Sequence, residues 1–329
     1  LITGGCGFIG HHFVEHFLKN TDWGIVVFDK LNYASNGFDR LRDIEVFDEG
    51  RVLVLSGDFS IPLSEGVKKE IGEVDYILHL GAETHVDHSI KDPESFIRSN
   101  VLGTMNVLNF ARELKNLKCF YYFSTDEVFG PAPEGIFYKE EDAHNPSNPY
   151  AASKSGGEML VKAYRNTYKL PAIITRTMNC IGERQHPEKF VPMTIKKVLD
   201  GETVIIHSNR ERTRAGSRFY IHARNVADGY LFLINEIEKG RSIIGEDFHI
   251  VGEKEIDNLE LAKLIAGILG KELRYEMIDF HSSRPGHDLR YALDGSKITR
   301  LGWTSPKTLE KSLEKTIRWA LENPKWLNI

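Results

Sequence analysis

Short apolar runs alternate with amphipathic segments through the first half of the chain. Such segments include HHFVEHFLKN (11–20) and PESFIRSNVLGTMNVLNFAREL (93–114), which have the pattern of helices. Strands that alternate with helices predict an α/β fold built on a Rossmann-type, doubly wound parallel sheet. We expect six buried strands within LIT (1–3), GIVVFD (24–29), RVLVLSGD (51–58), DYILHLGA (75–82), CFYYFSTDE (119–127) and PAIITRTMN (171–179).

A glycine-rich turn, TGGCGFIG, lies between the first predicted strand and the first predicted helix. Gly4, Gly7 and Gly10 allow a tight turn and a close approach of the backbone to a pyrophosphate at the helix N-terminus. Asp29 ends the second strand and suits the ribose hydroxyls of NAD. The adjacent Lys30 leaves NADP open as the alternative cofactor. Asp58, at the end of the third strand, is expected near the adenine.

Beyond about residue 182 the chain changes character, with helical patterns such as PMTIKKVLDG (192–201) separated by loops and shorter strands. We expect an NAD-binding domain over residues 1–182, with a returning segment near 217–245. A smaller mixed α/β domain, mainly for the substrate, is expected over residues 183–329.

The composition argues against a general nucleic-acid-binding protein and against a membrane-spanning one. The net charge of −5 gives no general nucleic-acid footprint, and no apolar run reaches the roughly 20 residues of a membrane-spanning helix. The three scattered cysteines predict reduced thiols in a cytoplasmic protein. Because LITGG resembles a strand already under way, we expect a few residues to precede it.

Two histidine patterns resemble metal sites, but we predict no metal. His12, Glu15 and His16 match H-x-x-E-H, yet their helix must pack on the sheet and point at the cofactor. His85 and His88 follow the fourth strand, where doubly wound folds bind ligands, so cofactor and substrate contacts are favoured there.

The segment NPYAASKSGGEML places Tyr150 and Lys154 four residues apart, on one face of a predicted helix. A neighbouring ammonium and a positively charged nicotinamide favour the phenolate, which makes Tyr150 a candidate base. Upstream, STDEVFG carries Thr125, Asp126 and Glu127 at the end of the fifth strand. Two carboxyls held close together tend to have different pKa values, so one can act as an acid and the other as a base.

These motifs together resemble the extended short-chain dehydrogenase/reductases, and within them the dTDP-glucose 4,6-dehydratase family. The resemblance runs nearly from end to end, and its most specific parts are the Asp126–Glu127 pair and the last two motifs of the set. The matching motifs are TGGCGFIG, FDKLNYAS, LGAETHVDHSI, STDEVFG, NPYAASKSGGE, GERQHPEKFVP and SRPGHDLRYALD.

The resemblance implies a lyase that uses NAD to dehydrate a nucleotide-activated hexose. Tyr150 would take the proton of the 4-hydroxyl, assisted by Thr125 and Lys154. Glu127 would remove the C5 proton, and Asp126 would protonate the departing 6-hydroxyl. The wider cofactor set implied is Gly4, Gly7, Phe8, Ile9, Gly10, Asp29, Lys30, Asn32, Asp58, Phe59, Leu80, Ala82, Thr84, Asn100, Tyr150 and Lys154.

The resemblance also implies substrate contacts and a homodimer. The dimer would form through a four-helix bundle of the helices near residues 94–114 and 150–168. The substrate contacts implied are His85, Thr125, Asn179, Glu188, Lys189, Arg218, Arg284 and His287.

The chain also departs from the family pattern, chiefly around the substrate. Cys180 replaces a usual asparagine, Phe129 replaces a usual tyrosine, and Lys254 lies near an expected asparagine. The stretch RERTRAG is longer than the usual turn of the family at this place. It lies in the basic run SNRERTRAGSR (208–218), which is either a solvated loop or an anion-binding or subunit-contact loop. These departures leave the nucleotide base and the hexose open.

Two other functions remain as alternatives. One is a UDP-sugar 4-epimerase or a decarboxylase of the same superfamily, against which the Asp126–Glu127 pair argues. The other is a non-catalytic nucleotide-binding regulator, which would have no need of the acid–base residues.

Overall fold

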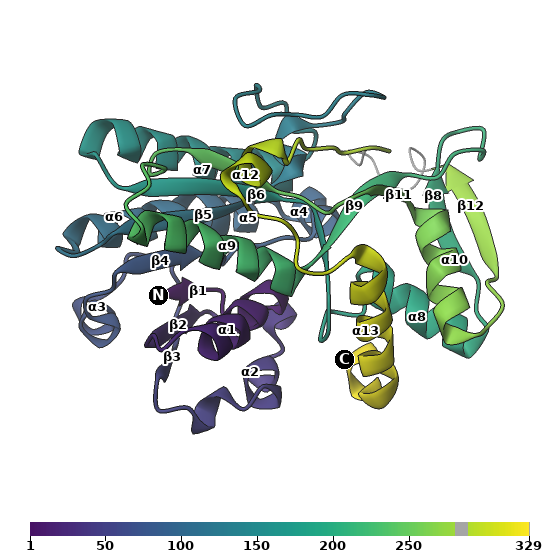
Figure 1. Cartoon of the computed structure of the whole chain (residues 1–329), viewed down its shortest axis with the longest axis horizontal. Coiled ribbons are helices and arrows are strands. Elements are labelled where there is room, and N and C mark those ends of the chain that lie inside the picture. The colour runs from purple at the N-terminus through teal and green to yellow at the C-terminus, as the bar shows by residue number, and fades with distance from the viewer. Residues whose placement is uncertain (280–288, 329) are drawn as a thin grey trace.

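A seven-stranded sheet forms the centre of the structure (Figure 1). The computed structural model describes residues 1–279 and 289–328. The strand order is β10-β6-β5-β4-β1-β2-β3, and all pairings are parallel, which confirms the predicted doubly wound fold. The strands are β1 (Ile2–Thr3), β2 (Ile25–Asp29), β3 (Val52–Ser56), β4 (Tyr76–His79), β5 (Cys119–Thr125), β6 (Ala172–Thr177) and β10 (Asp247–Ile250).

Six of these strands coincide with the six predicted from the sequence, whereas β10 was not predicted. In β10 the polar Asp247 and His249 alternate with apolar residues, so the run lacks the continuous apolar character of a buried parallel strand. Its polar side chains are satisfied by partners from distant segments: Asp247 accepts hydrogen bonds from Arg165 and Arg176. The edge position of β10 therefore depends on contacts that no local pattern contains.

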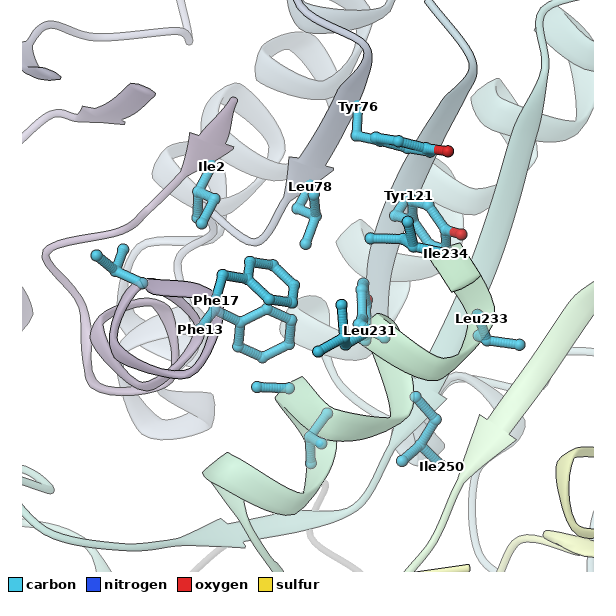
Figure 2. Close-up of a cluster of buried hydrophobic side chains, with 14 of the residues drawn as sticks. Ile2, Phe13, Phe17, Tyr76, Leu78, Tyr121, Leu231, Leu233, Ile234 and Ile250 are labelled. Atoms are coloured by element: carbon cyan, nitrogen blue, oxygen red, sulfur yellow. The ribbon is translucent and has the colours of Figure 1, made fainter. Parts of the chain in front are cut away.

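Helices cover both faces of the sheet, and side chains alternate between the two resulting cores. In β5, Cys119 and Tyr121 face one core, whereas Phe120 and Tyr122 face the other. Figure 2 shows part of the first core, where Phe13 and Phe17 meet residues of the sheet and of a second helix. The first core is covered by α1 (Phe8–Asn20) and α9 (Ala223–Glu238), and the second by α3 (Glu65–Ile71), α6 (Gly103–Glu113) and α7 (Pro149–Tyr168).

The helix expected over residues 93–114 is divided in the structure. It consists of α5 (Pro93–Ile97), a π-helical turn (Arg98–Leu102) and α6. The π turn contains Asn100, which is buried and aims its side chain at the loop after β4. Such turns occur frequently at functional sites.

The later part of the chain forms a third core beside the sheet (Figure 1). Its elements include a three-stranded sheet in the order β11-β9-β7 and a parallel pair of β8 and β12. The strands are β7 (Asn179–Ile181), β8 (Val204–Ser208), β9 (Ser217–His222), β11 (Glu255–Asp257) and β12 (Tyr275–Asp279). The helices are α8 (Phe190–Asp200), α10 (Asn258–Leu269) and α13 (Leu309–Glu322).

The remaining described helices are short or lie at the edges. They are α2 (Asp39–Asp43), α4 (Val86–Lys91) and α12 (Ser296–Leu301), with 3-10 turns at Tyr33–Ser35, Val46–Asp48, Asp126–Phe129 and Pro324–Leu327. Within residues 1–279 and 289–328, none of the helices combines the length and apolar character that a bilayer crossing requires.

A buried ion pair fastens α7 to the sheet. Arg176 of β6 donates from Nε to Glu158 Oε1 over 2.9 Å, and neither side chain is exposed. Burial alone would raise the pKa of Glu158, but the Arg176 charge and a hydrogen bond with His144 hold that pKa well below its usual range. Because α7 carries Tyr150 and Lys154, this pair fixes the helix that presents both residues.

We expect Glu158→Gln to lower the free energy of unfolding by about 3 kcal/mol, because it leaves the buried Arg176 with Asp247 as its remaining counter-charge. Urea denaturation measures this difference. Glu314→Gln, which removes an exposed carboxylate from its pair with Arg318, is the control and should cost under about 1 kcal/mol. Equal losses for the two variants would contradict the importance of the buried pair.

Candidate active site

The carboxyl ends of the central strands open onto one cavity of about 320 Å³. The glycine-rich turn after β1 forms its floor. Gly4 has a φ of 72°, and a Cβ there would lie 2.6 Å from Gly81 Cα. A Cβ on Gly10 would lie 2.1 Å from the Gly4 carbonyl oxygen. Because the turn carries no side chains at these positions, a pyrophosphate could approach its backbone closely at the N-terminus of α1.

Asp29 lines this cavity at the end of β2. Its Oδ2 accepts a hydrogen bond from the Cys6 N–H at 3.0 Å, and its Oδ1 accepts one from the Leu31 N–H at 2.8 Å. Burial raises the pKa of Asp29, and these two backbone hydrogen bonds act against the rise. A carboxylate has about four acceptor sites, so capacity remains for two ribose hydroxyls. The residues present fit an NAD-type dinucleotide.

Most residues expected to bind the cofactor line the cavity, and two do not. Asp58 is exposed and accepts a hydrogen bond from the Ser60 N–H at 2.8 Å. Asn100 lies behind the wall and donates to Ser153 Oγ at 2.8 Å. The predicted residues that do line it are Gly4, Gly7, Phe8, Ile9, Gly10, Asp29, Lys30, Asn32, Phe59, Leu80, Ala82, Thr84, Tyr150 and Lys154.

The five predicted catalytic residues, Thr125, Asp126, Glu127, Tyr150 and Lys154, all line the same cavity. They lie at the end of β5, in the 3-10 turn that follows it and at the start of α7. A side-chain cap begins the 3-10 turn, and another begins α7. Thr125 Oγ1 accepts from the Glu127 N–H at 3.4 Å and starts the 3-10 turn. Asn148 Oδ1 accepts from the Ala151 N–H at 2.8 Å and begins α7, with proline at the first helical position.

The two adjacent carboxyls are held by different neighbours. Thr125 Oγ1 donates to Asp126 Oδ1 at 3.0 Å, whereas Asn148 Nδ2 donates to Glu127 Oε2 at 3.1 Å. Asp126 Oδ2 is buried and has no hydrogen-bond partner among the described residues. Burial raises the pKa of Asp126 to about 6. Burial, followed by the charge of Asp126, raises the pKa of Glu127 to about 7. The pair therefore titrates close to neutrality.

Burial shifts the pKa values of Tyr150 and Lys154 away from those that favour a phenolate beside an ammonium. Lys154 Nζ donates to the Phe123 carbonyl at 2.6 Å, and burial lowers the pKa of Lys154 to about 7. Burial and the Glu127 charge raise the pKa of Tyr150, although a hydrogen bond with Thr125 opposes the rise. The sequence predicts that the charges of a lysine and a nicotinamide favour the phenolate, and burial acts in the opposite direction.

The residues expected to contact the substrate are distributed unevenly. Asn179, Glu188 and Lys189 line the cavity, as does Thr125. His85 lies outside the lining, with its Nε2 3.7 Å from Glu188 Oε2. Arg218 also lies outside the lining and donates to the carbonyls of Ser217 and Leu289 at 2.7 Å each. Its charge opposes the rise in the pKa values of Asp126 and Glu127 that burial causes. Arg284 and His287 lie outside the described residues.

Several cavity residues were not identified from the sequence. Glu83 sits between two predicted residues, Ala82 and Thr84, and that adjacency is a signal that could have found it. Asn148 lies outside the lining, and finding it required recognising that its side chain both caps α7 and donates to Glu127. The other unpredicted lining residues include Tyr33, Ser124, His186 and Tyr220.

The departures from the family pattern occupy different surroundings. Cys180 lines the cavity, and Phe129 is buried with its ring stacked on Tyr138 at 5.2 Å. Lys254 pairs with Glu310 and does not line the cavity. In the basic segment, Arg214 pairs with Glu134 at 3.1 Å.

The H-x-x-E-H residues serve packing and pairing on α1. His12 Nε2 lies 3.2 Å from the Glu183 carbonyl oxygen, and His16 Nε2 lies 3.7 Å from Asp228 Oδ2. Glu15 pairs with Lys19 and Arg224. Over residues 1–279 and 289–328, no group of three or more His, Cys, Asp or Glu side chains is arranged to hold a metal ion.

Known proteins that resemble this chain include 4,6-dehydratases and, at lower identity, 4-epimerases. The dTDP-glucose 4,6-dehydratase of Escherichia coli is 36% identical, covering 99% of this chain and 94% of that protein. The structure of the Streptomyces venezuelae dTDP-glucose 4,6-dehydratase with NAD bound superposes with a TM-score of 0.86 at 35% identity, covering 99% of this chain and 98% of that one. A Thermus thermophilus UDP-glucose 4-epimerase with NAD is more distant, with a TM-score of 0.83 at 25% identity, covering 97% of each chain.

These relatives confirm the predicted resemblance and, at the level of the family, the predicted dehydratase activity and NAD cofactor. The family model described as GDP-mannose 4,6 dehydratase matches residues 1–316. The chain therefore belongs to the GDP-mannose 4,6-dehydratase family, and its similar relatives include the dTDP-glucose 4,6-dehydratases.

Proposed function

We propose that this chain is an NAD-dependent hydro-lyase that converts a nucleotide-activated hexose of the dTDP-glucose or UDP-glucose type into its 4-keto-6-deoxy product. One observation carries the proposal: Asp126 and Glu127, with raised pKa values, share a cavity with Tyr150 and a dinucleotide-type glycine turn. This combination supplies a base for a C–H bond, an acid for a leaving hydroxyl, and a place for an oxidant.

The first half of the reaction uses Tyr150 and its neighbours. Bound NAD supplies the oxidant that accepts hydride from C4 and later returns it to C6. Tyr150 takes the proton of the 4-hydroxyl, and the side chain of Thr125 hydrogen-bonds to Tyr150. Positive charge from Lys154 and from the nicotinamide ring offsets the raised pKa of the buried phenol. Oxidation at C4 leaves a ketone, which acidifies the proton on C5.

The second half is an elimination that uses the two carboxyls. Glu127 removes the C5 proton, while Asp126 donates a proton to the 6-hydroxyl, which leaves as water. Both carboxyls have raised pKa values, so each can exchange a proton near neutral pH, and their assignment as base and acid follows the resemblance to the family. Asp126 Oδ2 has no hydrogen-bond partner among the described residues, so this oxygen is available to the 6-hydroxyl of the substrate. Hydride return to C6 and reprotonation at C5 complete the product.

The carboxyl pair distinguishes this function from the two alternatives. A 4-epimerase removes and returns hydride at C4 alone, so it needs neither the base at C5 nor the acid at O6. A non-catalytic regulator would gain nothing from burying two carboxyls, since burial at raised pKa costs stability at neutral pH. The dehydratase uses both carboxyls.

The substrate's diphosphate and sugar are assigned to the side of the cavity formed by residues beyond β6. Asn179, Glu188 and Lys189 line that side, and Arg218 acts from behind it. His85 lies beside this side of the cavity, with its Nε2 3.7 Å from Glu188 Oε2. In this division, residues 1–182 with the returning segment near 217–245 bind the cofactor, and residues 183–329 mainly bind the sugar nucleotide.

We also propose a cytoplasmic homodimer in which the helices near residues 94–114 and 150–168 form a four-helix bundle. Ile97, Leu102 and Met159 of these helices are 44%, 39% and 44% exposed. Apolar side chains gathered on neighbouring helices favour a covered interface. The three cysteines are free thiols in the structure, which suits a reducing compartment.

The function is tested by a product assay in deuterated water. The full chain is incubated separately with dTDP-, UDP-, CDP- and GDP-glucose, and products are read by mass spectrometry and NMR. We expect loss of water with one deuterium at C5 for one of these substrates, because Glu127 exchanges its proton with solvent. Conversion to the galactose epimer without deuterium would assign the chain to the epimerases instead.

Glu127→Gln should still reduce NAD when substrate is added, because oxidation at C4 does not use this carboxylate. Dehydration should fall by a factor of at least about 100, since a positioned general base contributes that much. Absorbance at 340 nm follows the reduced cofactor, and mass spectrometry follows water loss. Glu141→Gln, on an exposed loop, is the control. Dehydration by Glu127→Gln at the wild-type rate would rule out the assigned base.

Asp126→Asn should become more stable relative to the wild type as the pH rises. The pKa of Asp126 is raised from 3.8 to about 6 in the folded state, so its contribution to stability is fully present below the unfolded pKa and is lost as the pH rises through the folded pKa. We expect the difference in unfolding free energy to shift by about 2 kcal/mol in favour of the variant between pH 4.5 and pH 7.5. Urea denaturation at both pH values measures it, with the surface variant Asp22→Asn as control. A shift in the opposite direction would refute the raised pKa.

Met159→Glu should convert the dimer into a monomer, because it introduces a charge into the apolar bundle. Sedimentation velocity measures the mass of the wild type and the variant. Leu321→Glu, a comparably exposed apolar position on α13, is the control and should leave the dimer intact. A dimer that persists in Met159→Glu would place the interface elsewhere.

A further inference from the structure

Lys30 follows Asp29 in the wall of the cofactor cavity, and its ammonium is already paired with a carboxylate. Its Nζ lies 2.6 Å from Glu83 Oε1, with 24% of the Lys30 side chain and 16% of the Glu83 side chain exposed. The loop after β2 is thus joined to the loop after β4 by a partly buried ion pair. An ammonium held in this way is not free to receive a phosphate.

Glu83 is itself held firmly in place. Its N–H donates to Asn100 Oδ1 at 2.8 Å, and its carbonyl accepts from Asn100 Nδ2 at 2.9 Å. Asn32 Nδ2 donates to Glu83 Oε1 at 3.1 Å, so the same carboxylate oxygen binds two residues of the loop after β2. The buried π turn that carries Asn100 therefore fixes the carboxylate that engages Lys30.

The loop after β2 is also fixed from its own side. Leu31 has a φ of 56°, a left-handed conformation that residues other than glycine seldom adopt. Its N–H donates to Asp29 Oδ1 at 2.8 Å, and Asn32 Oδ1 accepts from the Ala34 N–H at 3.1 Å. Asp29, Lys30 and Asn32 are consequently presented in one arrangement, in which the ammonium faces Glu83.

The charges around this wall disfavour an additional phosphate. Asp29 and Glu83 contribute two carboxylates against the single ammonium of Lys30. Arg40 lies close enough for its charge to act on Asp29, but it is fully buried outside the cavity lining. Its Nε donates to the Arg184 carbonyl, and its Nη1 donates to the carbonyls of Ala34 and Ser35. A 2′-phosphate on the adenosine ribose would meet net negative charge.

We propose that Glu83 is a specificity-determining residue that makes the site select NAD over NADP by engaging Lys30. Asp29 receives the ribose hydroxyls, and Glu83 removes the cation that a 2′-phosphate would otherwise use. The inference rests on the proposed function, because it assumes that the glycine turn and Asp29 hold a nicotinamide dinucleotide.

Glu83→Gln tests the inference, because the amide still accepts from Asn32 while its negative charge is gone. Dissociation constants for NAD and NADP are measured by isothermal titration calorimetry on the full chain after removal of bound cofactor. We expect the dissociation constant for NADP to fall at least tenfold and that for NAD to change less than threefold. An unchanged ratio of the two constants would overturn the proposal.

Two further variants show whether Lys30 is the cause. Lys30→Met alone should leave the dissociation constant for NADP within threefold of the wild type, because the ammonium is already engaged. In Glu83→Gln/Lys30→Met the tenfold gain should disappear; a gain that persists without Lys30 would overturn the proposal.

Glu113→Gln removes the same charge from an exposed pair with Lys68 and is the matched control. It should leave both constants unchanged, and a tenfold gain in NADP binding there would overturn the proposal by making net charge the cause. If the wild type bound neither dinucleotide, the proposed function itself would fail.

Discussion

Parallel strand pairing is the constraint on which the rest of this structure depends. Because all seven strands of the central sheet run in one direction, their carboxyl ends lie along one edge, and the loops that follow them meet there. The cavity is thus reached by the glycine turn after β1, Asp29 at the end of β2, Glu83 after β4 and the acid–base pair after β5. The close contact between Gly4 and Gly81 shows how tightly neighbouring loops must approach at this edge.

Burial gives the catalytic groups their chemistry, and polar partners make that burial possible. Removal from water brings the pKa values of Asp126, Glu127 and Lys154 close to neutrality. Asn148 connects the start of the helix that carries Tyr150 to the carboxylate of Glu127. Asn100 similarly connects the loop of Glu83 to Ser153 on the same helix. Asparagine suits both places because its amide donates and accepts at once.

The anchoring of α7 links the stability of the fold to its function. Glu158 lies four residues beyond Lys154, and its buried pair with Arg176 holds the helix against β6 and β10. The Glu158 charge also acts to raise the pKa of Lys154, against the larger effect of burial. A change in this pair would alter both the position and the charge of the residues that face the substrate. The same buried ion pair therefore contributes to the stability of the fold and to the arrangement of the active site.

The sequence by itself determined the features that arise from neighbouring residues: six strands, the glycine turn, Asp29 at a strand end, and the spacing of Tyr150 and Lys154. Turn geometry and helical periodicity depend on residues a few positions apart, so they can be read locally. Only the tertiary structure decided β10, the Lys30–Glu83 and Glu158–Arg176 pairs, and the contact between Asn148 and Glu127. Their partners come from segments far apart in the chain, and which segments meet follows from the path of the whole sheet. The same reason explains Tyr150, because burial and the charge of Glu127, which come from distant segments, raise the pKa of its phenol.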